Sequence, residues 1–210
     1  TKKRYGQWII NDGGVTCDRL DVKGLDIVRS NFPVAFKTLM TEVLQDILSN
    51  VDKDIIDNKI LNLKEEMKEM NLSDIALPTG VKNLKKFKDK TINRFSADTM
   101  FTDVRKGTPV HVKAAIMYND LLRKYKLTDV QPIRSSDKIK WVYLKSNPFN
   151  IPAIAFKGYD DPDEVLDFIK QYVDHEKLFD RALNKKLKNW YEALSWDEPV
   201  NKEETLERFF

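Results

Sequence analysis

A run of cations that ends in an aromatic residue opens the chain: Lys2, Lys3, Arg4 and Tyr5. The aromatic and β-branched residues that follow, up to Asn11, predict that this run begins a β-strand. Lysine and arginine pair with phosphate oxygens, and a tyrosine ring can pack against a sugar or a base edge. The run therefore suits contact with a nucleic-acid backbone. Cations at a solvated strand end are the alternative.

A second candidate phosphate contact lies just before a predicted helix. Arg29 and Ser30 precede Asn31 and Pro33, which we expect to cap and open that helix. Backbone N–H groups at a helix N-terminus can hold a phosphate group when a cation lies beside them.

Charge is unevenly distributed, although the net charge of the chain is only +3. Residues 80–146 contain sixteen Lys or Arg against six Asp or Glu, whereas residues 160–210 contain eight against fourteen. The most basic stretch, 80–106, also carries Phe87 and Phe95. This imbalance favours a polyanionic partner for the middle of the chain, with an ordinary excess of surface lysine as the alternative.

The C-terminal residues place Leu206, Phe209 and Phe210 within one helical turn. If the tail forms such a turn, the three side chains make one hydrophobic surface that a pocket on a partner could receive. An exposed pair of phenylalanines in a polar terminus indicates that something covers it. A tail folded onto the core of its own chain is the alternative.

Catalytic motifs are absent from the sequence. It contains no dinucleotide-binding or P-loop glycine pattern, no H-E-x-x-H and no G-x-S-x-G. Asp12, Asp18, Asp21 and Asp26 are close in sequence, but solvated acids explain them better than a metal site does. For His111, capping or packing is a better explanation than contact with phosphate. We therefore expect no catalytic residue, metal or cofactor within this chain.

Length and composition predict one domain, or a domain plus a fragment, because 210 residues with 41% hydrophobic side chains can bury a sizeable core. No apolar run approaches the roughly 18 residues that cross a bilayer. One cysteine, Cys17, excludes an internal disulfide, and with two histidines it excludes a structural zinc site. We expect a cytoplasmic protein in a reducing compartment. Because the chain begins at Thr1 within a basic run, we expect a piece of a longer protein.

Hydrophobic periodicity predicts helices and short strands in a mixed order. The predicted strands cover 5–11, 15–20, 25–28, 72–77, 138–145 and 153–156. The predicted helices cover 31–48, 52–70, 110–125, 162–172 and 174–194. The Asp-Gly-Gly turn at 12–14 predicts that the first two strands form a hairpin.

The order of these segments resembles the C-terminal part of B-family DNA polymerases, most closely the replicative enzymes of T-even-type phages. The resemblance extends over essentially the whole chain. It is carried by KKRY, KGLDIVRSNFP, GTPVHVKAAIMYN, KWVYLKSNPFN, IAF and LERFF. The first two are similar to the family's KKxY motif and to the KG-x-[ED]-x-x-R entry to the thumb. The tail departs from the wider clamp-binding pattern because Glu203 stands where glutamine is usual.

The resemblance implies an α+β fold, mainly an α-helical thumb with small antiparallel β elements and an N-terminal β-hairpin from the palm. It implies the end of the palm at 1–27, the thumb at 28–200 and a clamp-binding tail at 201–210. The residues it implies near the primer 3′ end and the primer backbone are Lys2, Lys3, Arg4, Tyr5, Arg29 and Ser30. Those it implies along the duplex product are Asn83, Lys85, Lys86, Lys106, Lys113 and Lys145. Those it implies in the clamp pocket are Leu206, Phe209 and Phe210.

The partners that the resemblance implies are primer-template DNA, a sliding clamp and the remaining exonuclease, palm and fingers domains of the polymerase. The two aspartates that bind magnesium in the complete polymerase belong to motifs upstream of KKRY, and nothing in this chain matches them. We therefore expect the chain alone to be an inactive part of a nucleotidyltransferase. The alternative is a free-standing, non-catalytic accessory protein that binds DNA and a clamp. A split-gene product, a truncated reading frame and an excised fragment all fit the sequence.

Overall fold

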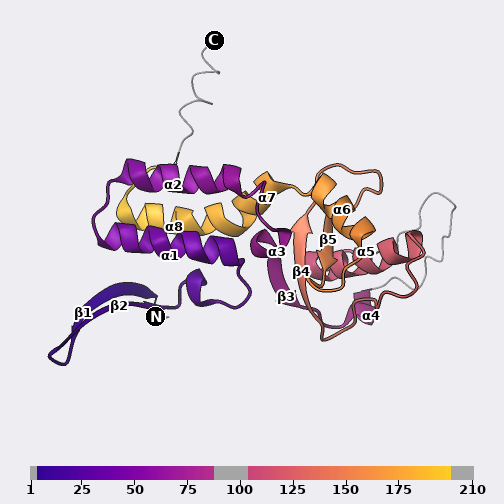
Figure 1. The fold of residues 1–210 in the computed structure, drawn as a ribbon, viewed down its shortest axis with the longest axis horizontal. Helices are drawn as coiled ribbons and strands as arrows, with labels where there is room; N and C mark the ends of the chain where they lie inside the picture. Colours follow the sequence, from indigo (N-terminus) through magenta and orange to yellow (C-terminus); the bar gives the residue numbers. More distant parts are fainter. Residues whose placement is uncertain (1–3, 88–103, 200–210) are drawn as a thin grey trace, which may run out of the picture. The chain divides into compact units, whose positions relative to one another are not determined.

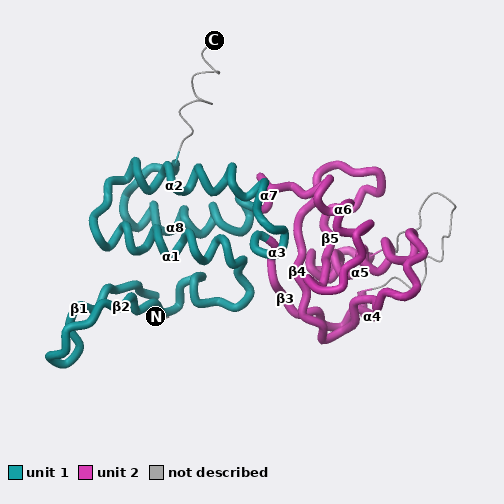
Figure 2. Tube along the Cα trace, viewed as in Figure 1, with its two compact units in different colours: residues 1–75, 179–210 teal, residues 76–178 magenta. Residues whose placement is uncertain are grey.

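The computed structural model describes residues 4–87 and 104–199. The chain divides into two compact units, one formed by residues 1–75 and 179–210 and the other by residues 76–178 (Figure 2). We call them unit 1 and unit 2. Residue 27, where the family resemblance implies that the palm ends, lies inside unit 1, and residues 28–200, the implied thumb, contribute to both units.

A β-hairpin begins unit 1, as the sequence predicts. Strands β1 (Tyr5–Asp12) and β2 (Val15–Lys23) pair antiparallel, with Tyr5 opposite Lys23. The turn between them requires glycine because both of its residues, Gly13 and Gly14, have positive φ angles of 60° and 93°. Near the other end of β1, Gly6 lies against the side chain of Leu44, where a Cβ atom would come within 2.7 Å of a methyl group.

Three helices of unit 1 lie side by side: α1 (Val34–Leu48), α2 (Lys53–Glu66) and α8 (Lys185–Leu194) (Figure 1). Their buried residues recur at helical spacing. In α1 these are Phe36, Leu39, Met40, Val43 and Leu44. Helix α3 (Leu72–Ile75) packs against α1.

Two local predictions for unit 1 are wrong. Residues Asp26–Val28 form the short 3-10 helix η1 and not a strand, and the Arg29 N–H donates to the carbonyl of Asp26 at 3.0 Å. Asn31 does not cap α1, because Pro33 occupies the N-cap position and makes no side-chain capping bond. A proline at this position sets the backbone angle for the helix without needing a hydrogen-bond partner for an N–H group.

Unit 2 is built on an antiparallel sheet with the order β3-β4-β5: β3 (Leu77–Gly80), β4 (Lys138–Tyr143) and β5 (Ala153–Phe156). The predicted strand at 72–77 is wrong for its first four residues, which form α3. Helix α5 (Val110–Lys124) packs against β5, all four residues of which are buried. Helix α6 (Asp163–Tyr172) contacts α5, and α4 (Leu84–Phe87) follows the first strand.

The remaining described elements run from unit 2 into unit 1 along the sequence. They are α7 (His175–Phe179), the π-helical segment η2 (Asp180–Asn184) and then α8. No helix in the described part of the chain has the length and apolar character needed to span a membrane.

Candidate nucleic-acid interface

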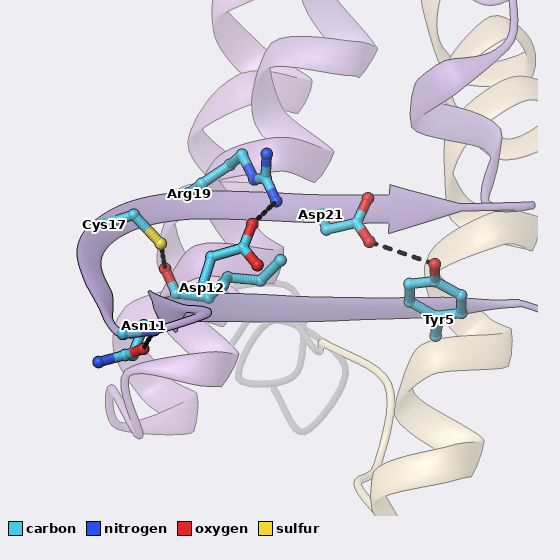
Figure 3. A network of polar contacts seen from close by, with 8 residues as sticks. Tyr5, Asn11, Asp12, Cys17, Arg19 and Asp21 are labelled. Atoms are coloured by element: carbon cyan, nitrogen blue, oxygen red, sulfur yellow. Dashed lines mark hydrogen bonds and ion pairs between the residues drawn. The ribbon is translucent and has the colours of Figure 1, made fainter.

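Two residues of the N-terminal basic run, Arg4 and Tyr5, lie at the start of the hairpin within the described part of the chain. Arg4 is exposed just before β1, and Tyr5 is half-buried at the start of that strand. The Tyr5 hydroxyl donates a hydrogen bond to Asp21 on β2 at 3.2 Å, and this bond, with burial and the carboxylate charge, raises the pKa of the phenol (Figure 3). The tyrosine is therefore neutral at pH 7 and tied to the neighbouring strand. Lys2 and Lys3 lie outside the described residues.

Separate partners hold the four aspartates near the N-terminus. Asp12 pairs with Arg19 at 3.2 Å near the turn of the hairpin (Figure 3). Asp18 accepts a hydrogen bond from the indole of Trp8. Within the described residues no group of three His, Cys, Asp or Glu side chains could hold a metal ion.

Arg29 and Ser30 are exposed and precede α1, as the sequence predicts. Arg29 already has an internal partner, because its guanidinium lies 3.0 Å from a carboxylate oxygen of Asp26. The same oxygen of Asp26 lies 3.5 Å from the ammonium of Lys186 on α8. A phosphate at this site would therefore compete with a carboxylate for Arg29.

Several exposed cations of unit 2 lie on or beside α4. Lys85 and Lys86 are exposed on this short helix, and Asn83 precedes it in the left-handed conformation, with φ of 56°. The Asn83 carbonyl accepts a hydrogen bond from the Lys86 N–H at 2.9 Å. Leu84 anchors the helix because its side chain is buried and its N–H donates to the Ser135 hydroxyl at 3.2 Å.

A turn beside α4 adds a third exposed lysine. The Arg105 N–H donates to the carbonyl of Phe87, the last residue of α4, at 3.3 Å. Lys106 and Gly107 follow as an exposed turn, and Gly107 has φ of 83°. We call Lys85, Lys86 and Lys106 the α4 lysine cluster. Among the described residues, none of the three has an ion-pair partner.

The other predicted contacts in unit 2 differ in position. Lys113 is half-buried in the first turns of α5, which packs against α4. Lys145 is exposed beyond the end of β4, where its N–H donates to the Tyr172 carbonyl at 2.8 Å. The loop that contacts α4 lies at the opposite end of β4, which as a six-residue strand spans about 20 Å. Lys145 is therefore not part of the α4 lysine cluster.

His111 does not add a cation at neutral pH. It is half-buried in the first turn of α5, and burial lowers the pKa of its imidazole below the usual value. This agrees with packing as its role.

Sequence reasoning missed a set of cations that surrounds a groove in unit 2. Arg123, Lys126 and Arg134 line this groove together with Lys85. The basic run at 123–126 was visible in the sequence, but Arg134 comes from a separate loop, so only the fold brings the set together. The clamp residues of the sequence prediction, Leu206, Phe209 and Phe210, lie outside the described residues.

No family model matches the chain. It is 23% identical over 200 residues to the "DNA-directed DNA polymerase" of Enterobacteria phage T4. The matched region covers 93% of this chain and 21% of that protein, so the chain spans about a fifth of its relative's length. The chain is thus distantly similar, along nearly all of its own length, to one portion of a DNA-directed DNA polymerase.

Proposed function

We propose that this chain is the duplex-gripping portion of a B-family DNA polymerase, formed by the end of the palm and the thumb. The observation that carries the proposal is the similarity to a DNA-directed DNA polymerase over 200 residues. In this proposal the chain holds primer-template DNA by its backbone. The catalytic aspartates and their magnesium ions belong to a part of the polymerase outside this chain.

The α4 lysine cluster supports backbone contact. Lysine is a flexible point charge that neutralises phosphate without reading a base, so such contacts are independent of DNA sequence. The three lysines come from two adjacent segments, joined by the hydrogen bond between Arg105 and Phe87. None of the three lysines forms an ion pair with a described acidic residue, so no such pair has to be broken when a phosphate binds.

The hairpin has a different part in the proposal. Arg4 and Tyr5, with Lys2 and Lys3 before them, hold the primer-template near the primer 3′ end. Because the Tyr5 hydroxyl is engaged with Asp21, the ring and not the hydroxyl is the group that meets a sugar or base. Arg29 contributes less than the sequence suggests, since Asp26 neutralises part of its charge.

The C-terminal tail completes the proposal. Leu206, Phe209 and Phe210 enter a hydrophobic pocket on a sliding clamp. Each such side chain supplies roughly 1.5–3 kcal/mol on burial, from which the cost of ordering the tail is subtracted. The clamp contact is therefore modest alone and stronger when DNA and clamp are bound together.

Salt dependence of DNA binding tests the proposal. The measurement is the fluorescence anisotropy of a labelled duplex of mixed sequence with a recessed 3′ end. Replacing both Lys85 and Lys86 by Gln should flatten the slope of log K against log[salt] by up to about 2. Each lysine that neutralises a phosphate releases about one counterion from the DNA, and the variant lacks two such lysines.

The matched control replaces Lys170 and Lys177 by Gln, which removes the same charge from exposed positions of the same unit, near the end of β4 that lies away from α4. Its slope should equal that of the unchanged chain. If the Lys85 and Lys86 variant also keeps the original slope, α4 is not on the DNA-binding surface.

A further inference from the structure

A preformed groove lies between α4, the end of α5 and the loop that follows α5. It encloses about 850 Å³, and Leu84, Leu122 and Ile133 form a buried apolar floor. Its rim is basic and comprises Lys85, Arg123, Lys126 and Arg134. None of the described residues that line the groove is acidic. We call it the basic groove.

Hydrogen bonds hold the walls of the basic groove in place. The Asn119 side chain on α5 donates to the Ile133 carbonyl at 2.9 Å and accepts from the Ile133 N–H at 2.7 Å. The loop is also tied to the segment before α4, because the Ser136 N–H donates to the Val81 carbonyl at 2.7 Å. A binding site with walls fixed in this way loses little conformational entropy when it is filled.

The charge and shape of the basic groove define the chemistry of its occupant. An apolar floor of this size accepts bulky apolar side chains, whereas phosphate groups gain nothing from it. The described residues of the lining include no aromatic side chain on which a single-stranded base could stack. The rim cations come from three separate segments, so an occupant must carry several negative charges spaced along its length.

We propose that the basic groove binds an acidic peptide segment of another protein, with one or two large apolar side chains on the floor and carboxylates along the rim. The carboxylates meet Lys85, Lys126 and Arg134, which are exposed. Arg123 already pairs with the buried carboxylate of Asp120, so its contribution is smaller. This site is additional to the phosphate contacts proposed for the α4 lysine cluster and shares only Lys85 with it.

Binding of a synthetic peptide to the whole chain tests the proposal. The probe is a short fluorescein-labelled peptide rich in Asp and Glu that carries one Leu and one Phe. Replacing Lys126 and Arg134 by Gln should weaken its binding about fivefold or more, since each rim charge contributes modestly. The same Lys170 and Lys177 double variant is the matched control and should bind the peptide normally.

A second pair of measurements tests the apolar floor. Val130→Asp adds a carboxylate at a half-buried position of the lining and should weaken binding about tenfold or more. A peptide in which Ser replaces Leu and Phe should lose a similar amount. Circular dichroism spectra that match those of the unchanged chain establish that each variant is folded. If Val130→Asp does not fold, the Lys126 and Arg134 double variant still tests the proposal, because both of its positions are exposed.

The proposal is overturned if the serine peptide binds as well as the original, because the groove would then act only as a basic surface. It is also overturned if Val130→Asp removes binding of duplex DNA together with that of the peptide, since the groove would then belong to the nucleic acid. The proposal is supported if the Lys126 and Arg134 double variant loses peptide binding but keeps the slope of log K against log[salt] that the unchanged chain shows with duplex DNA.

Discussion

Two buried tyrosines should respond differently to the same substitution: one should lose stability and the other should not. The Tyr191 side chain on α8 is 1% exposed, and its hydroxyl donates to Asp57 on α2. Tyr118 on α5 is also buried, but its hydroxyl has no partner with good hydrogen-bond geometry among the described residues, although burial and, after it, the nearby charge of Asp161 raise its pKa. Replacing either tyrosine by Phe removes one oxygen and leaves the ring, so the difference between the two variants reports on the hydrogen bond.

The expected magnitudes follow from these contacts. Tyr191→Phe removes a hydrogen bond to a charged acceptor, which contributes about 1.5–3 kcal/mol. Since Asp57 keeps its ion pair with Lys53, we expect a loss near the lower end, about 1.5 kcal/mol. Tyr118→Phe removes a buried hydroxyl without a partner and should leave the free energy of unfolding unchanged or raise it by about 1 kcal/mol.

Urea unfolding followed by circular dichroism measures both free energies. Each tyrosine lies in a different unit, so the signal should be fitted with two transitions where two are resolved. A loss for Tyr118→Phe as large as that for Tyr191→Phe would refute the reasoning. It would mean that the Tyr118 hydroxyl has a partner in solution, and Asp161 would be the first candidate because its charge, after burial, raises the pKa of this phenol.

Three other predictions follow. The chain with primer-template, dNTPs and Mg²⁺ should extend no primer, because it lacks the paired aspartates that hold two catalytic metals; template-dependent extension by pure protein would contradict this. Replacing Phe209 and Phe210 by Ala should abolish binding to a clamp in a pull-down assay and leave DNA binding and thermal stability nearly unchanged; a large loss of stability would mean that the tail belongs to the chain's own core. The free energy of unfolding should fall as pH rises above about 10, because burial raises the pKa of Tyr118 and Tyr191 in the folded state and the unfolded chain releases these protons first. Tyr191→Phe should reduce the fall by up to about 1.4 kcal/mol per pH unit, and an equal fall in both proteins would contradict this.

Strong local patterns predicted much of the secondary structure. The Asp-Gly-Gly turn between β-branched runs predicted the hairpin correctly, because few residues tolerate the positive φ angles of that turn. The spacing of Phe36, Leu39, Met40 and Val43 predicted α1 because it places four apolar side chains on one face of a helix, and that face must be buried.

Short segments were predicted less well, because tertiary contacts decide their conformation. The β-branched Ile27 and Val28 favour a strand, yet Asp26–Val28 turn as η1, where Asp26 meets both Arg29 and Lys186. Lys186 is far away in the sequence, so no local pattern contains this information. The basic groove was missed for the same reason, because its rim combines residues from α4, α5 and a loop.

Ion pairing distinguishes two of the phosphate contacts predicted from the sequence, Arg29 before α1 and the lysines around α4. Arg29 is paired with Asp26. Such exposed or half-exposed pairs contribute up to about 1 kcal/mol, and a phosphate that takes the cation must offset that loss. At the α4 lysine cluster, no ion pair with a described residue has to be broken before a phosphate binds. Backbone contacts with DNA should therefore draw more of their free energy from α4 than from the entry to α1, although the segment with Arg29 is the one that resembles a family motif in sequence.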